Sequence, residues 1–313
     1  MKVAEKNVSH VTSFVLLGFT ARSDILLLLF IMFLVIYVLT IFGNSVILHV
    51  IYHSSQLHRP MYYFLGNLAL LDIIYCTVIS PRMLATFLVK DKSITLVSCV
   101  LQMFLFLALI SSESILLALM AYDRYLAVCR PLRYQSIMTG TFCLRLVATA
   151  YCWGLVQSFF HTCFTFTLKF CKSDIDYFFC DIPPLLKLSC SDTFINELVL
   201  FTFCGVNEGG SALVVVVSYI LIVSSILRIR SDKGRRRTAS TCVSHFLVFT
   251  LYYGSLFFIY LKPRWRRSVD VDRVASVVYA VAIPMLNPII YSLRNTEIRL
   301  SFLKIFRAAF NRS

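Results

Sequence analysis

The sequence predicts an all-α membrane protein: a seven-transmembrane helix bundle with a short amphipathic helix after the seventh span. Hydrophobic residues make up 58% of the 313 residues and charged residues only 15%, whereas roughly 25% of the residues in soluble domains are charged. A soluble domain of this size would need a polar surface that this chain cannot supply, and a bilayer removes that need. Seven apolar runs are each long enough to cross about 30 Å of hydrocarbon as a helix.

The seven runs follow one another along the chain, separated by short polar connections. Backbone groups that face lipid must satisfy their own hydrogen bonds, so each run should be a helix. We expect these helices over residues 25–52, 61–84, 95–122, 142–164, 196–227, 240–261 and 274–293. The chain then divides into an extracellular N-terminus (1–24), a seven-transmembrane domain (25–293) and a cytoplasmic tail (294–313).

A further helix is expected in the tail, over residues 296–310, because apolar side chains recur there at helical spacing with basic ones between them. The apolar set is Ile298, Phe302, Ile305, Phe306 and Ala309, and the basic set is Arg299, Lys304 and Arg307. The pattern is typical of a basic amphipathic helix on the inner leaflet. The alternative is a frayed tail.

The net charge of +14 can indicate either nucleic acid or an anionic membrane surface as a partner. The basic residues lie in short stretches between apolar runs, as at 233–237, and are not interleaved with aromatics on a soluble face. We interpret them as charge that flanks the membrane, so lipid and not nucleic acid is the expected partner.

The orientation of the chain is not decided by basic residues, because Lys and Arg are divided almost evenly between the two sides. Asn7-Val8-Ser9 is an acceptor pattern for N-glycosylation, which takes place on the lumenal side. Residues 169–193 fall on the same side and hold three cysteines, which would be stable as disulfides only outside the cytosol. With no evident signal peptide, the first span would direct insertion and leave the N-terminus extracellular.

The chain has eleven cysteines. Most lie singly in apolar runs and are interpreted as small buried side chains. Four lie in or beside polar stretches instead: Cys99, Cys171, Cys180 and Cys190. No pair has the spacing of a zinc site.

Polar and charged residues inside four of the runs are costly in a bilayer and are usually functional. Asp72, Glu113, Asn44 and Asn287 lie at similar depth in the second, third, first and seventh runs. We expect one shared polar cluster, in which a proton or a sodium ion relieves the repulsion between the two carboxylates. The alternative is that each group has a separate hydrogen-bond partner.

Two further motifs suggest moving parts. Asp123-Arg124-Tyr125 closes the third run and could form a local ion pair that breaks when a partner docks, or it could simply anchor the helix at the interface. Pro284 and Pro288 interrupt the seventh run near Asn287 and Tyr291, a pattern that fits a hinge; the alternative is a static kink.

Enzyme, transporter and channel classes fit poorly. The histidines are scattered, and there is no nucleophile motif, phosphate loop or metalloprotease signature. A transporter should show paired halves with matching broken helices, whereas only the seventh run is broken by prolines and the number of runs is odd. No organic cofactor is expected.

Several long motifs, in order and spread over nearly the whole chain, carry a family resemblance. Asn44, Asp72, Asp123-Arg124-Tyr125, Trp153 and the Asn287–Tyr291 segment resemble rhodopsin-like G-protein-coupled receptors. The segments 57–65, 120–129, 240–245 and 284–295 are similar to those of olfactory receptors, and the ending Ser292-Leu293-Arg294-Asn295 resembles the tetrapod-type class.

This resemblance implies an odorant-activated receptor at the plasma membrane, in sensory cilia, that activates a heterotrimeric stimulatory G protein and raises cyclic AMP. It implies two disulfides, Cys99–Cys180 and Cys171–Cys190. By position, the residues expected to line the ligand site are Phe106, Leu107, Ile110, Ser111, Phe203, Asn207, Tyr253, Phe257 and Tyr260. The residues expected to form the coupling switch are Asp123, Arg124, Tyr125, Tyr219, Asn287, Pro288 and Tyr291.

The chain departs from the family pattern in three places. Arg237-Thr238-Ala239 stands where the family has Lys-Ala-Phe, and Lys172 follows Phe170-Cys171 where a glycine is usual. The loop before the seventh run carries Arg264, Arg266 and Arg267. We interpret this cluster as charge that faces water or lipid headgroups; the alternative is that it attracts carboxylate odorants.

Overall fold

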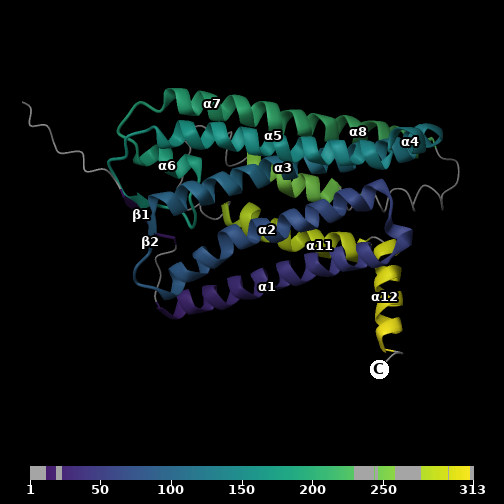
Figure 1. Ribbon diagram of the computed structural model, residues 1–313, viewed down its shortest axis with the longest axis horizontal. Helices are drawn as coiled ribbons and strands as arrows, with labels where there is room; N and C mark the ends of the chain where they lie inside the picture. The colour runs from purple at the N-terminus through teal and green to yellow at the C-terminus, as the bar shows by residue number, and fades with distance from the viewer. Residues whose placement is uncertain are drawn as a thin grey trace, which may run out of the picture.

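The computed structural model describes residues 12–18, 23–228, 243, 246–257, 276–294 and 296–310. Long helices run side by side along the molecule (Figure 1). The first four spans are α1 (Ser23–His53), α2 (Pro60–Leu88), α3 (Leu96–Cys129) and α5 (Gly140–Phe166). The fifth is a continuous helix made of α7 (Phe194–Cys204), a π-helical segment η2 (Gly205–Gly209) and α8 (Gly210–Leu227). These five helices are long and apolar enough to cross a membrane.

The sixth and seventh runs contribute shorter described helices. Phe246–Phe257 lies within the sixth run, and Tyr279–Tyr291 lies within the seventh. In the seventh, a π-helical segment η4 (Val278–Ala282) leads into α11 (Ile283–Arg294). With the five longer helices they give the seven-helix bundle that the hydropathy pattern predicts.

In the part of the chain that the structure describes, three short helices connect the spans: η1 (Ser55–Leu57), α4 (Pro131–Ile137) and α6 (Ile182–Leu188). The tail forms α12 (Thr296–Phe310), with the predicted bounds, and turns away from the bundle axis at the end where α11 stops (Figure 1). Glu297 fastens α12 to α2, because it accepts hydrogen bonds from Tyr62 Oη at 2.8 Å and from Arg59 at 3.4 Å.

The third helix is longer than the hydropathy pattern predicts. The expected end at residue 122 is wrong, because α3 continues to Cys129 and carries Asp123-Arg124-Tyr125 within it. A charged pair ends an apolar run without ending the helix. The helix ends instead before Pro131, which cannot continue the backbone hydrogen bonding of the preceding turn.

A small sheet, which the all-α prediction does not include, lies at one end of the bundle. Strand β1 (Ser13–Leu16) pairs antiparallel with β2 (Ser93–Thr95), with Ser13 opposite Thr95, and parallel with β3 (Asp174–Ile175). Phe14 and Leu16 point inward and are fully buried. Strands this short leave no periodic signal in the sequence.

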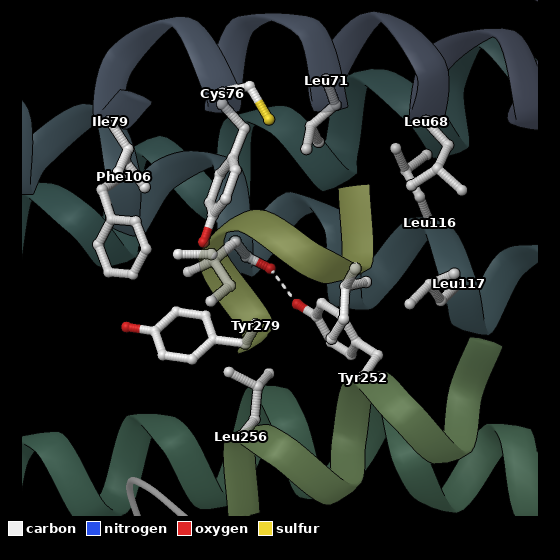
Figure 2. Packing of buried hydrophobic residues seen from close by; sticks show 14 of the residues in the cluster. Leu68, Leu71, Cys76, Ile79, Phe106, Leu116, Leu117, Tyr252, Leu256 and Tyr279 are labelled. Carbon is white, nitrogen blue, oxygen red and sulfur yellow. Dashed lines mark hydrogen bonds between the residues drawn. The ribbon is translucent and has the colours of Figure 1, made fainter. Parts of the chain in front are cut away.

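Helix α3 packs tightly against α5 at Gly154. A β-carbon at this position would overlap the Ala108 carbonyl oxygen and the Ser112 hydroxyl of α3. Small residues let helix backbones approach closely in membrane proteins, where burial from water does not drive association. Figure 2 shows part of the apolar interior, with Leu68 and Leu71 of α2 on one side and Leu116 and Leu117 of α3 on the other.

Candidate functional site

A narrow cavity of about 30 Å³ lies between α3, α5, the α7–η2 segment and the helix Phe246–Phe257. The lining side chains are Leu107, Ile110, Ser111, Gln157, His161, Leu200, Cys204, Glu208 and Leu256. The wall is mainly apolar, and a few polar groups converge on it, as in most small-molecule sites.

The fifth helix supplies Glu208, the one acidic group among the described lining residues. Gly205 and Gly209 are the first and last residues of the π-helical segment that holds it, and Gly210 follows directly. Asn207 and Glu208 are adjacent in sequence, yet both are buried. Single π-helical turns occur often at functional sites, because they re-aim side chains within a helix.

A chain of hydrogen bonds orients the Glu208 carboxylate. Trp153 Nε1 donates to Asn207 Oδ1 at 3.0 Å, and Asn207 Nδ2 donates to Glu208 Oε1 at 2.8 Å. The Ser114 hydroxyl lies beside the same carboxylate and also forms a hydrogen bond with Ser211 Oγ at 2.6 Å. Within the described residues, the other carboxylate oxygen, Oε2, has no hydrogen-bond partner.

Three of the nine residues expected to line a ligand site, Leu107, Ile110 and Ser111, lie in the wall of this cavity. Asn207 and Tyr253 are not among the lining residues given above, and their side chains make hydrogen bonds to other groups. The Asn207 amide oxygen accepts from Trp153 Nε1, and Tyr253 Oη donates to the Ser114 carbonyl at 3.0 Å.

The remaining predicted lining residues pack against other aromatic side chains or lie outside the described residues. Phe106 packs against Phe179 at 5.1 Å and Tyr279 at 6.0 Å between ring centroids. Phe203 packs on His161 at 5.3 Å, and Phe257 packs on Tyr253 at 6.1 Å. Tyr260 lies outside the described residues.

Sequence reasoning missed six lining residues: Gln157, His161, Leu200, Cys204, Glu208 and Leu256. Two signals could have found some of them. Glu208 is an acidic residue inside an apolar run, the same signal that singled out Asp72 and Glu113. Gln157 and His161 are four residues apart in the fourth run, so they share one helix face.

The loop before the fifth helix covers the end of the bundle that carries the sheet. The structure contains both disulfides that the resemblance implies: Cys99–Cys180 joins α3 to this loop, and Cys171–Cys190 closes the loop on itself. Gln102 Oε1 accepts from Cys180 N at 3.0 Å.

The seventh helix also holds this loop. Tyr279 Oη donates to Asp181 Oδ2 at 3.1 Å, and Phe178 and Phe179 are buried. The loop therefore forms a packed roof on the bundle.

The intramembrane polar residues form a smaller cluster than predicted. Asn287 Nδ2 donates to Asp72 Oδ2 at 3.0 Å, and the Asn287 side chain also lies beside Glu113. Asn44 instead donates to the backbone oxygens of Thr40 and Pro284, at 3.0 and 3.2 Å. It thus bonds to the backbone of the seventh helix, and three of the four expected residues meet.

The acid of the Asp123-Arg124-Tyr125 motif is bound by a tyrosine. Tyr134 Oη of α4 donates to Asp123 Oδ1 at 2.8 Å, and among the described residues no ion pair joins Asp123 to Arg124. Adjacent residues on a helix point about 100° apart, so they do not face each other. Burial and the nearby Asp123 raise the pKa of Tyr134, which keeps its proton available for this bond.

The other expected switch residues surround this end of the bundle. Tyr125 packs against Tyr122, and Tyr219 packs against Phe246 and Phe249 of the sixth run, at 5.7 and 5.5 Å between ring centroids. Tyr291 is buried, and Pro288 contacts α1 at Gly43. Arg124 Nε is buried without a hydrogen-bond partner among the described residues. Residues 240–242, at the start of the sixth run, lie outside the description, as do Asn7, Arg264, Arg266 and Arg267.

The arrangement of helices is similar to that of squid rhodopsin, with a TM-score of 0.70. The two chains are 15% identical, and the match covers 93% of this chain and 88% of that one. The fold is therefore that of the rhodopsin-like seven-helix membrane proteins.

Sequence comparison is more specific. The family model described as "Olfactory receptor" matches residues 33–308. Olfactory receptor 5M5 of Mus musculus is 45% identical over 307 residues, which cover 98% of this chain and 96% of that protein. Olfactory receptor 5I1 of Homo sapiens is 43% identical over 314 residues, which cover all of both chains. The chain belongs to the olfactory receptor family and is a multi-pass membrane receptor, not an enzyme.

Proposed function

We propose that this receptor binds a small organic odorant in the cavity bounded by Leu107, His161 and Glu208, and in response activates a stimulatory G protein that raises cyclic AMP. The observation that carries the proposal is a mainly apolar cavity between the helices, in a bundle whose roof is fastened by the Cys99–Cys180 disulfide. A narrow site with an apolar wall and few polar groups suits small apolar molecules. We place the protein in the plasma membrane of sensory cilia.

We propose an extracellular N-terminus, and the disulfides support this orientation. Cys99–Cys180 and Cys171–Cys190 lie at the end of the bundle where β1, near the N-terminus, pairs with β3. Disulfides persist in oxidising compartments, which supports an extracellular N-terminus. Glycosylation of Asn7 in cells, detected as a mass shift removed by glycosidase and absent from Asn7→Gln, would support this orientation. If the wild-type chain at the cell surface is not glycosylated, the disulfides would be the remaining support for this orientation.

Coupling is proposed to depend on Arg124. Its Nε atom has no hydrogen-bond partner among the described residues, and the nearest acid along the helix, Asp123, is bound by Tyr134. An outward movement of the sixth helix would leave Arg124 free to meet the G protein, with Tyr219 and Tyr291 moving in beside it. An odorant that binds the open form tenfold more tightly supplies about 1.4 kcal/mol for this shift.

The test is Arg124→Ala, with Arg145→Ala, an exposed arginine on α5, as the matched control. Both variants should reach the surface and bind odorant, and only Arg124→Ala should lose the cyclic-AMP response. A normal cyclic-AMP response from Arg124→Ala at wild-type surface levels would contradict the coupling mechanism.

We also propose a sodium ion between Asp72 and Glu113. Three buried oxygens fit it: Asp72 Oδ1, Glu113 Oε1 and Asn287 Oδ1 have no hydrogen-bond partner among the described residues. Carboxylate and amide oxygens are the ligands that hard cations prefer. The described chain has no group of three or more His, Cys, Asp and Glu side chains placed to hold a metal, so the site would rely on the Asn287 amide.

Sodium should therefore alter signalling by the wild-type receptor and have less effect on Asp72→Asn. Signalling that is indifferent to sodium in both proteins would contradict this site.

A further inference from the structure

We propose that the cavity selects molecules with one hydrogen-bond-donating head on an aliphatic body, amines before alcohols, and that Glu208 and Gln157 accept the donated bonds. This rests on the proposed function, because it takes the same cavity as the odorant site.

The first observation is a pair of acceptor atoms in one wall. Glu208 Oε2 and Gln157 Oε1 both lack a hydrogen-bond partner among the described residues, and their side chains line the same cavity. Both residues are buried, at 5% and 7% exposure. Leaving buried polar atoms unpaired costs free energy. A ligand that donates hydrogen bonds to these two oxygens removes that cost, which favours its binding.

The second observation is that the protein donors beside Glu208 are already used. Asn207 Nδ2 donates to Glu208 Oε1, and Tyr253 Oη donates to the Ser114 carbonyl. Tyr252 Oη donates to the Ile110 carbonyl at 2.7 Å, and its side chain points into the packed interior near Tyr279 (Figure 2). With these donors bonded elsewhere and the Ser114 hydroxyl bonded to Ser211, a ligand can supply the donor that Glu208 Oε2 lacks.

The third observation is charge. Among the described residues, the lining contains Glu208 and no lysine or arginine. An ammonium head would place a positive charge against this carboxylate in a largely apolar site, where charge-assisted hydrogen bonds are strong. A carboxylate head would meet like charge instead. A ketone oxygen cannot donate to Glu208 or Gln157, so it would leave both acceptors unpaired and could only accept from other lining groups such as Ser111 or His161. The rest of the wall, Leu107, Leu200 and Leu256 among it, suits an aliphatic body.

The test measures binding directly, so that it does not depend on coupling. Purified receptor is titrated with matched linear aliphatic amines, alcohols, ketones and acids of butyl to heptyl length, and thermal stabilisation gives each affinity. Amines and alcohols should bind at least about tenfold more tightly than ketones of the same length, and acids should bind most weakly.

Glu208→Gln makes the sharpest variant. The amide oxygen that this substitution introduces can still accept from Asn207, and the new amide nitrogen would then point a donor into the cavity where Oε2 was. The order should invert: amines lose about tenfold or more, and ketones gain. Glu197→Gln on α7, whose carboxylate accepts from Thr193 Oγ1 outside the cavity, is the matched control and should leave the order unchanged.

A second variant keeps the inference falsifiable if Glu208→Gln does not fold. Gln157→Leu removes one acceptor and should weaken amines and alcohols while leaving ketones unchanged. Equal affinity for amines and ketones in the wild type, or no binding by any member of the series, would overturn the inference. A cyclic-AMP response to other odorants would still support the proposed function, and amine binding without any cyclic-AMP response would contradict only that function.

Discussion

The contact between α3 and α5 should fail if Gly154 gains a methyl group. In Gly154→Ala, the added carbon would overlap the Ala108 carbonyl oxygen and the Ser112 hydroxyl. Neither of these two oxygen atoms can move away without a cost in free energy. The first is backbone, and Ser112 Oγ is held by hydrogen bonds to Ala108 O at 2.8 Å and Ala150 O at 3.3 Å.

The size of the effect follows from two opposing contributions. Overpacking a close contact costs about 1–3 kcal/mol, and the upper part of that range applies because a backbone atom blocks the methyl group. Replacing glycine by alanine within a helix stabilises the helix by about 0.5–1 kcal/mol. The net loss for Gly154→Ala is about 2 kcal/mol, which corresponds to a Tm about 3 °C lower for a chain of this size.

The assay uses the receptor's own buried thiols. Cys76, Cys143 and Cys204 are free and buried, so a thiol-reactive dye reports their exposure as the detergent-solubilised protein unfolds on heating. Gly140→Ala is the control, because no atom lies within 4 Å of a β-carbon there, and its Tm should stay at or slightly above that of the wild type. A Gly154→Ala variant that melts with the wild type would refute the close approach of α5 to α3.

Three further predictions concern the two ends of the bundle. Cys99→Ser or Cys180→Ser should abolish surface expression or the response to odorant, since loss of a native disulfide costs about 2–5 kcal/mol in small secreted domains. Peptide mapping that finds both thiols free in the wild-type protein would contradict the pairing. Tyr134→Phe removes a hydrogen bond to Asp123, and a bond to a charged group contributes about 1.5–3 kcal/mol. Amide exchange over residues 131–137 should therefore accelerate about tenfold or more. Unchanged exchange would count against this hydrogen bond. Glu297→Ala should accelerate amide exchange in the first turns of α12 while leaving α11 unaffected, and equal exchange in both proteins would show that α12 is held by other contacts.

Hydropathy predicted the spans because the cost of placing a side chain in lipid depends mostly on that side chain and its depth. The five longest helices and α12 accordingly agree with the expected ranges to within a few residues, apart from the end of α3. That end depended on Pro131, a backbone effect, and not on the polarity of Asp123. Family membership was also readable from the sequence, because the motifs at 120–129 and 284–295 are long and contiguous.

Only the tertiary structure decided which polar groups meet. Residues 207 and 208 are adjacent, and an α-helical pattern would point them about 100° apart, yet the π-helical turn buries both and leaves one Glu208 oxygen unpaired in the cavity wall. Asp123 pairs with Tyr134 through the position of a short connecting helix, and the sheet joins strands that lie far apart in the chain. Sequence spacing fixes angles within one helix, whereas the partner of each side chain depends on how helices rotate and pack against one another.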